Sequence, residues 1–195
     1  MRLFAGILVG FLLVAVGAAV LIGLGSYNVA ASIPPGKLEE SLARLALNRS
    51  VARRAPVVKN AMAASADVLR EGLSHYRENC VGCHGAPGVD AAEYGQGLNP
   101  PAPDLTLPRI QKRPDGELFW IVSNGIRMTG MPAFGPTHKE EHLWKIVAFL
   151  RHLPELSPEE EKELKAGAEE ESRHHGEPEA PSGDAHPPDI KPNQD

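Results

Sequence analysis

Two kinds of residue are scarce in this 195-residue chain, which has two cysteines and ten aromatic residues (five Phe, three Tyr and two Trp). Two cysteines cannot build the disulfide framework that holds many small secreted domains together. So few aromatic residues leave a small domain short of core, because a domain of this size buries only part of its surface. The composition therefore predicts a folded domain with few large core side chains.

A large excess of charge is also absent. The formal net charge is −5, which is too close to neutrality for a dedicated nucleic-acid-binding protein. Residues 155–195 contain thirteen acidic and four basic residues, whereas residues 1–154 contain twelve acidic and sixteen basic ones. The acidity thus belongs to a C-terminal tail, and the rest of the chain is mildly basic.

No charged residue occurs between Arg2 and Lys37. Residues 3–25 are apolar or glycine, and as a helix they would be about 34 Å long, enough to cross a hydrocarbon core about 30 Å thick. We expect an uncleaved transmembrane anchor in residues 1–30, because the apolar part of a signal peptide has only about 7–15 residues. The alternative is a signal peptide that is cleaved near the small residues before Ser32. Arg2 predicts a cytoplasmic N-terminus, with the rest of the chain on the extracytoplasmic, periplasmic side of a bacterial membrane.

The chain after the anchor divides into three predicted parts. Residues 31–65 are expected to form a neck, because a Pro-Pro-Gly sequence is followed by leucines at helical spacing. Residues 66–154 are expected to form the folded domain. Residues 155–195 are predicted to be an acidic tail, with a short helix from the capping Ser157 to about residue 171 and a disordered end.

The predicted domain contains helices and loops. One helix leads into Cys80, a loop rich in glycine and proline follows over residues 84–114, and further helices are predicted at residues 118–126 and 139–153. No stretch shows the convincing apolar–polar alternation of a half-buried strand. The expected fold is therefore all-α, a single domain with long Gly/Pro loops preceded by one transmembrane helix.

The two cysteines stand in one motif. Cys80, Cys83 and His84 form C-x-x-C-H, the attachment signature of c-type haem. Two thiols at this spacing lie on one side of a helical turn, within reach of both vinyl groups of one porphyrin, and the next residue can ligate the iron. A structural zinc site would need a second cysteine pair, and a thioredoxin-like dithiol would need a βαβ context. We therefore predict one covalent haem c, bound through Cys80 and Cys83.

The second axial ligand has three candidates downstream: Met128, Met131 and His138. The motif, the Gly/Pro loop, the Met131-Pro132 pair and the amphipathic last helix together resemble the monohaem, class I-like cytochromes c, in a membrane-anchored bacterial form. The resemblance covers about residues 66–154. It implies that His84 and Met131 are the axial ligands of the haem iron, although Met128 offers the same soft sulfur.

The resemblance also implies a crossing of the first and last helices of the domain. Gly72 and Tyr76 of the first helix are expected to pack against Trp144 and Phe149 of the last, as core residues. In addition, a carbonyl in the proline loop, of Pro100 or Pro101, is expected to accept the Nδ1–H of the proximal histidine and raise the basicity of its ring.

Ligation by His84 and Met131 closes both axial positions and raises the reduction potential. We therefore expect an electron carrier, or the cytochrome subunit of a respiratory or dehydrogenase complex, and no enzyme in its own right. The expected partners are the membrane and redox proteins, without nucleic acid, small-molecule substrate or catalytic residues. The alternative function is a haem enzyme or gas sensor with a labile sixth ligand, which requires that Met131 does not bind.

Membrane anchoring by residues 3–25 has a direct test. The protein should stay in the membrane fraction during extraction with alkaline carbonate, because the apolar run cannot leave the bilayer without exposing its surface to water. Its intact mass should correspond to a chain that begins at or near Met1. A mature mass that begins near Ser32 would replace the anchor with a cleaved signal peptide.

Overall fold

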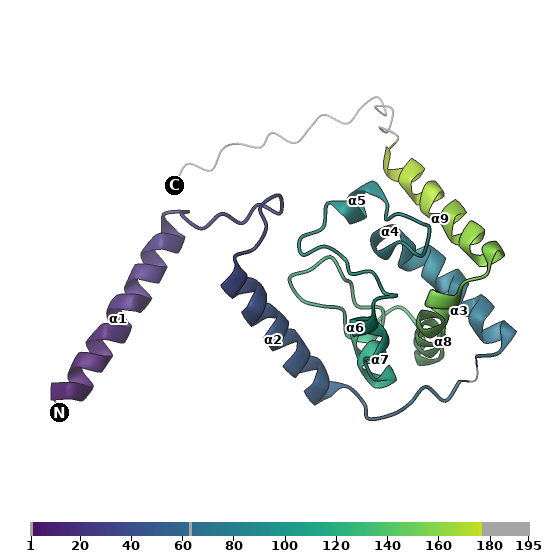
Figure 1. The fold of residues 1–195 in the computed structure, drawn as a ribbon. Coiled ribbons are helices and arrows are strands. Elements are labelled where there is room, and N and C mark those ends of the chain that lie inside the picture. The colour runs from purple at the N-terminus through teal and green to yellow at the C-terminus, as the bar shows by residue number, and fades with distance from the viewer. Residues whose placement is uncertain (1, 63, 177–195) are drawn as a thin grey trace.

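The computed structural model describes residues 2–62 and 64–176, and within them all regular secondary structure is helical (Figure 1). The described residues contain no strand, only an isolated bridge between Ala86 and Val89. This confirms the all-α prediction. The helices are α1 (Arg2–Gly23), α2 (Lys37–Arg54), α3 (Ala66–Asn79), α4 (Val81–His84), α5 (Glu93–Gln96), α6 (Pro108–Gln111), α7 (Asp115–Asn124), α8 (Glu140–His152), the 3₁₀ turn η1 (Leu153–Glu155) and α9 (Pro158–Gly176).

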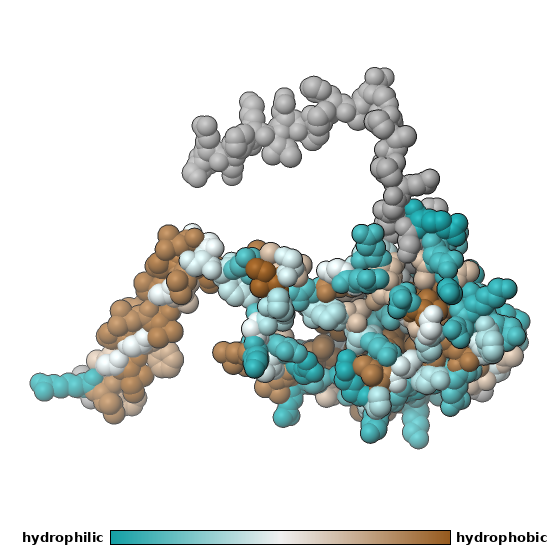
Figure 2. All heavy atoms as spheres, turned by 45° about the horizontal axis from the view of Figure 1, so that its top comes forward, coloured by the Kyte–Doolittle hydropathy of each residue, from teal (hydrophilic) through white to brown (hydrophobic). Residues whose placement is uncertain are grey.

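Helix α1 coincides with the uncharged run and buries none of its residues. Figure 2 shows its visible face as mostly hydrophobic, unlike the mixed surface of the rest of the molecule, and no charged residue follows Arg2 within the helix. A helix that is apolar on every side is suited to a membrane span. Of the described helices, α1 alone is long and apolar enough to cross a bilayer, which fits the predicted anchor.

The folded part is organised around the crossing of α3 and α8. Gly72 lies at the contact, where an added Cβ atom would stand 2.5 Å from the backbone oxygen of Lys145 and 2.7 Å from the Cβ of Phe149. Tyr76 packs beside Phe149 with ring centroids 5.5 Å apart, and both side chains are fully buried. The expected crossing is present with one difference: Trp144 stacks on Phe119 of α7, with centroids 4.2 Å apart.

Helix α9 completes the core beyond the expected end of the domain at residue 154. It packs on α3 and α4, and its Leu164 and Ala168 belong to the same buried cluster as Cys80 and Val81. A capping box starts the helix, because Ser157 Oγ accepts the Glu160 N–H while the Glu160 carboxylate accepts the Ser157 N–H. The helix extends to Gly176, longer than predicted. The predicted disorder from 177 onwards lies outside the described residues.

The Gly72 contact predicts a large effect of a small substitution. Gly72→Ala should lower the free energy of unfolding by about 2 kcal/mol, because the added methyl group overpacks a helix crossing that has backbone on the other side. Gly97→Ala is the matched control, since a Cβ there would meet its nearest neighbour at 3.6 Å. Chemical denaturation of the detergent-solubilised protein measures both. Equal losses for the two variants would contradict the close approach at Gly72.

Candidate haem site

The C-x-x-C-H motif begins where α3 ends. Cys80 caps α3 and is buried, and α4 then holds Cys83 and His84, which are half-buried. The amide groups of Cys83 and His84 both donate to the Cys80 backbone oxygen, at 3.1 and 2.9 Å. These bonds wind residues 80–84 into a single helical turn, as the motif requires. The crossing of α3 on α8 therefore also fixes the position of the motif.

The end of this turn is fastened back to α3. The Tyr76 hydroxyl donates a 2.6 Å hydrogen bond to the Gly85 backbone oxygen, and burial raises the pKa of Tyr76 well above its usual value. Gly85 has φ +60°, and a Cβ there would stand 2.5 Å from the Val89 oxygen. A left-handed turn without a side chain thus lets the chain reverse immediately after His84.

His84 is oriented by the proline loop. Its Nδ1 lies 2.8 Å from the backbone oxygen of Pro103, and since a carbonyl only accepts, Nδ1 carries the proton and donates it. Sequence reasoning anticipated this bond but assigned it to Pro100 or Pro101. Burial lowers the pKa of His84, and the bond to Pro103 only partly opposes this effect. The ring is therefore held neutral with an unprotonated Nε2, the state in which imidazole ligates a metal.

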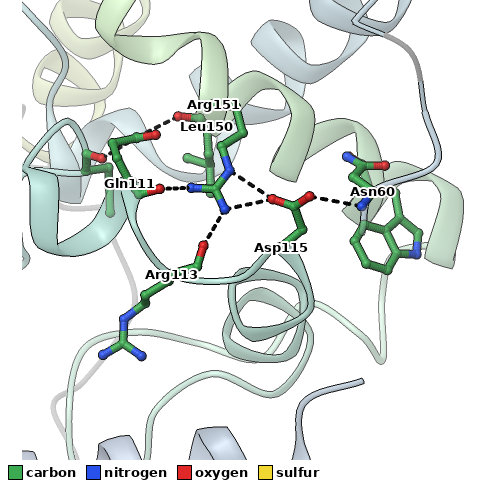
Figure 3. A network of polar contacts seen from close by, with 8 residues as sticks. Asn60, Gln111, Arg113, Asp115, Leu150 and Arg151 are labelled. Atoms are coloured by element: carbon green, nitrogen blue, oxygen red, sulfur yellow. Dashed lines mark hydrogen bonds and ion pairs between the residues drawn. The ribbon is translucent and has the colours of Figure 1, made fainter. Parts of the chain in front are cut away.

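Residues 111–115, at the end of the proline loop and the start of α7, are held by Arg151 of α8 (Figure 3). The Arg151 guanidinium donates to Asp115 Oδ1 at 2.7 and 2.9 Å and to the backbone oxygens of Gln111, at 2.5 Å, and Arg113. Gln111 Nε2 in turn donates to the Leu105 oxygen at 2.7 Å. This network supports the loop that orients the histidine. No sequence signal singled out Arg151, because its partners are mostly backbone atoms.

Asp115 is the anionic member of this network. Burial alone would raise the pKa of Asp115, but the Asn60 amide and the Arg151 guanidinium outweigh it and hold the pKa below its usual value. The Asn60 N–H donates to Asp115 Oδ2 at 3.0 Å, and the Asn60 side chain donates to the Trp144 oxygen at 2.8 Å. The network therefore ties the segment before α3 to α7 and α8.

The two candidate methionines differ in their surroundings. Met131 is partly buried and packs against the cluster that contains Cys80 and Val81, and its amide donates to Thr129 Oγ1 at 3.1 Å. Met128 is 91% exposed, in a left-handed conformation with φ 60°. A Cβ on Gly130 would stand 2.6 Å from Cδ2 of Leu98. The loop that contains Met128 and Met131 therefore lies close against the Gly/Pro loop of residues 84–114.

The third candidate, His138, belongs to another group of rings. It lies beside His75, with ring centroids 5.6 Å apart, and Thr137 Oγ1 is 2.9 Å from its Nδ1. His75 in turn neighbours His142 at 4.9 Å. His138 also lies beside Phe134, with ring centroids 5.4 Å apart, so its ring packs on Phe134 and on His75 of α3.

The donor set fits a covalently attached haem. The thiols of Cys80 and Cys83 belong to one helical turn, and the neutral imidazole of His84 has Nε2 available. The Met131 thioether packs against the buried cluster that contains Cys80. In the part of the chain that the structure describes, no three His, Cys, Asp or Glu side chains are grouped to hold a metal ion. The residues of the motif thus suit an iron that a macrocycle holds from its own nitrogen atoms, with protein groups needed only along one axis.

Residues 67–150 match the family described as cytochrome C oxidase, cbb3-type, subunit III. This segment is a c-type cytochrome domain. It spans the structure from the start of α3 to the end of α8 and contains the motif, the proline loop and both methionines. No curated protein matches the chain. A cytochrome c domain carries out electron transfer with haem, so the predicted class of protein and its haem chemistry are confirmed at this level.

Attachment through the motif has a test that does not depend on activity. The haem should remain on the denatured protein through an SDS gel, because thioether bonds survive denaturation. A double variant, Cys80→Ala with Cys83→Ala, should lose the haem stain. Extraction of the haem from the unmodified protein into acidified organic solvent would contradict covalent attachment.

The Arg151 network predicts a pH-dependent stability. Because the pKa of Asp115 is lowered on folding, its contribution should be complete above about pH 4, the usual carboxyl pKa, and should be lost as the pH falls through the lower, folded-state pKa. Asp115→Asn should cost about 1–3 kcal/mol at pH 7, and progressively less as the pH falls below about 4.

Urea denaturation of both proteins across this pH range makes the measurement. Glu40→Gln serves as the control, since Glu40 pairs with Arg44 on the exposed surface of α2 and its loss should cost at most about 0.5 kcal/mol. A cost for Asp115→Asn that stays constant down to pH 2 would contradict the assignment.

Proposed function

We propose that this protein is a membrane-tethered electron carrier, or the cytochrome subunit of a membrane redox complex, with His84 and Met131 as the axial ligands of one covalent haem. The observation that carries the proposal is the contrast between the two methionines. Met131 packs against the cluster that contains the first cysteine of the motif, while Met128 is turned out to solvent.

The haem supplies the one-electron Fe(II)/Fe(III) couple, and the chain sets its conditions. Cys80 and Cys83 would hold it at the turn of residues 80–84, and the Pro103 carbonyl fixes the tautomer and orientation of His84. Met131 would be the second protein ligand of the iron, which would leave no position for a substrate or a gas. A thioether ligand favours the reduced state and raises the potential.

The proposal includes the location. Helix α1 anchors the protein as a single span with a cytoplasmic N-terminus, and the cytochrome domain lies on the periplasmic side. The anchor keeps the domain near partners in the same membrane and so raises its effective concentration there. The matching family is that of an oxidase subunit, which supports a membrane-bound respiratory complex as the partner.

Replacement of Met131 tests the ligation. Met131→Ala should open the sixth position, lower the reduction potential and allow carbon monoxide to bind the ferrous protein, because the iron loses its soft axial ligand. Met128→Ala is the matched control and should change none of these properties. Optical spectra of the reduced protein with and without carbon monoxide provide the readout.

If the unmodified ferrous protein binds carbon monoxide readily at neutral pH, the sixth position is open. The function then becomes that of a haem enzyme or gas sensor. If Met128→Ala opens the site and Met131→Ala does not, the ligand has been assigned to the wrong methionine.

A further inference from the structure

Helix α2 carries an apolar stripe that nothing in the described chain covers. Leu38, Leu42 and Leu45 recur at helical spacing and are 74%, 56% and 54% exposed. Arg49 and Arg53 continue the stripe toward the C-terminal end of the helix, and both are exposed. One line along α2 therefore presents three leucines followed by two cations.

The other side of α2 packs on the cytochrome domain. Val51 is fully buried, and α2 contacts α7. Val51 follows Leu42 by nine residues, which is a rotation of about 180° along an α-helix. Asn48 Oδ1 also accepts a 2.5 Å hydrogen bond from Arg113. The leucine stripe thus faces away from the domain because the opposite face is already in use.

The connection between α1 and α2 is short, and hydrogen bonds join it both to α2 and to the cytochrome domain. The Tyr27 hydroxyl hydrogen-bonds the Glu39 carboxylate, so the first turn of α2 is tied to a residue four positions beyond the end of α1. Asn99 Nδ2 donates to the backbone oxygens of Ala31, at 2.9 Å, and Ile33, at 2.8 Å. Only residues 24–30 separate α1 from this attachment to the domain, a span of at most about 25 Å. The domain therefore stays close to the surface of the membrane that holds α1.

The size and charge of the stripe favour lipid over protein as its partner. Three leucines fall far short of the roughly 1,000 Å² that a specific protein interface buries. An interfacial helix needs less, since the anchor already supplies a high local concentration. Leucines that enter the headgroup boundary, with arginines beside anionic headgroups, are the usual composition of such helices.

We propose that α2 lies on the membrane surface with Leu38, Leu42 and Leu45 in the headgroup–acyl boundary, and that it holds the cytochrome domain in one orientation above the bilayer. This inference rests on the proposed anchoring by α1 and is independent of the haem ligation. It makes α2 a second membrane contact, on the side of the domain where α2 packs on α7.

The test measures the depth of labelled positions in the lipid of nanodiscs. The full-length holoprotein is placed in nanodiscs of phosphatidylcholine and phosphatidylglycerol, and an environment-insensitive fluorophore is attached to a cysteine that replaces Leu42. Fluorescence is compared with and without doxyl-labelled lipid, so that quenching by the haem cancels in the ratio. The unmodified chain serves as the labelling blank.

Three further positions are labelled for comparison. Val9→Cys in α1 is the positive control. Ala166→Cys, exposed on α9, is the negative control. Glu40→Cys reports another face of α2. We expect doxyl quenching at position 42 to exceed that at positions 40 and 166 by at least about twofold, since only the stripe enters the boundary region. Arg49→Gln with Arg53→Gln should reduce the quenching at position 42 in anionic nanodiscs.

The outcomes separate the two proposals. Quenching at position 9 without quenching at position 42 retains the anchor and overturns the inference. Absence of quenching at both positions overturns the anchor and the inference together. Efficient crosslinking between two copies through a cysteine at position 42, without quenching there, assigns the stripe to a protein contact and also overturns the inference.

Discussion

The close approach of α3 and α8 at Gly72 is the constraint on which the cytochrome domain depends. Because no side chain separates the two backbones, the buried rings of Tyr76 and Phe149 can pack together directly beside the crossing. Helix α3 leads straight into the turn that carries Cys80 and His84. Helix α8 supplies Arg151, which holds the loop after Pro103. The contact of Gly72 with α8 thus sets the positions of the attachment turn and of the loop that supports it.

Much of this architecture could be predicted from local sequence. The uncharged run predicted the ends of α1 to within a few residues. The apolar spacing in residues 139–153 predicted a helix whose ends differ from those of α8 by one residue each. The motif itself states the chemistry, since C-x-x-C-H has few competing uses. The choice between Met128 and Met131 also followed from a local signal, the proline at position 132, and remains a prediction for the ligation.

The parts that could not be predicted depend on contacts between distant residues. Pro100, Pro101 and Pro103 offer equivalent carbonyls in sequence, and only the course of the loop brings that of Pro103 to His84. Likewise, the sequence of α8 is compatible with a place for Trp144 in the crossing with α3. In the structure its ring stacks on Phe119 of α7. Periodicity identifies which residues are buried far better than it identifies which residue each one meets.

The position of α9 has a consequence for what counts as the autonomous folding unit. The segment that matches the cytochrome family ends at residue 150, yet the buried side chains of Leu164 and Ala168 in α9 belong to the same cluster as Cys80 and Val81 of the attachment turn. A chain cut at the family boundary would leave Val81 and its neighbours facing water. The buried cluster that contains Cys80 and Val81 is therefore complete only when a helix from outside the family-matched segment has packed against it.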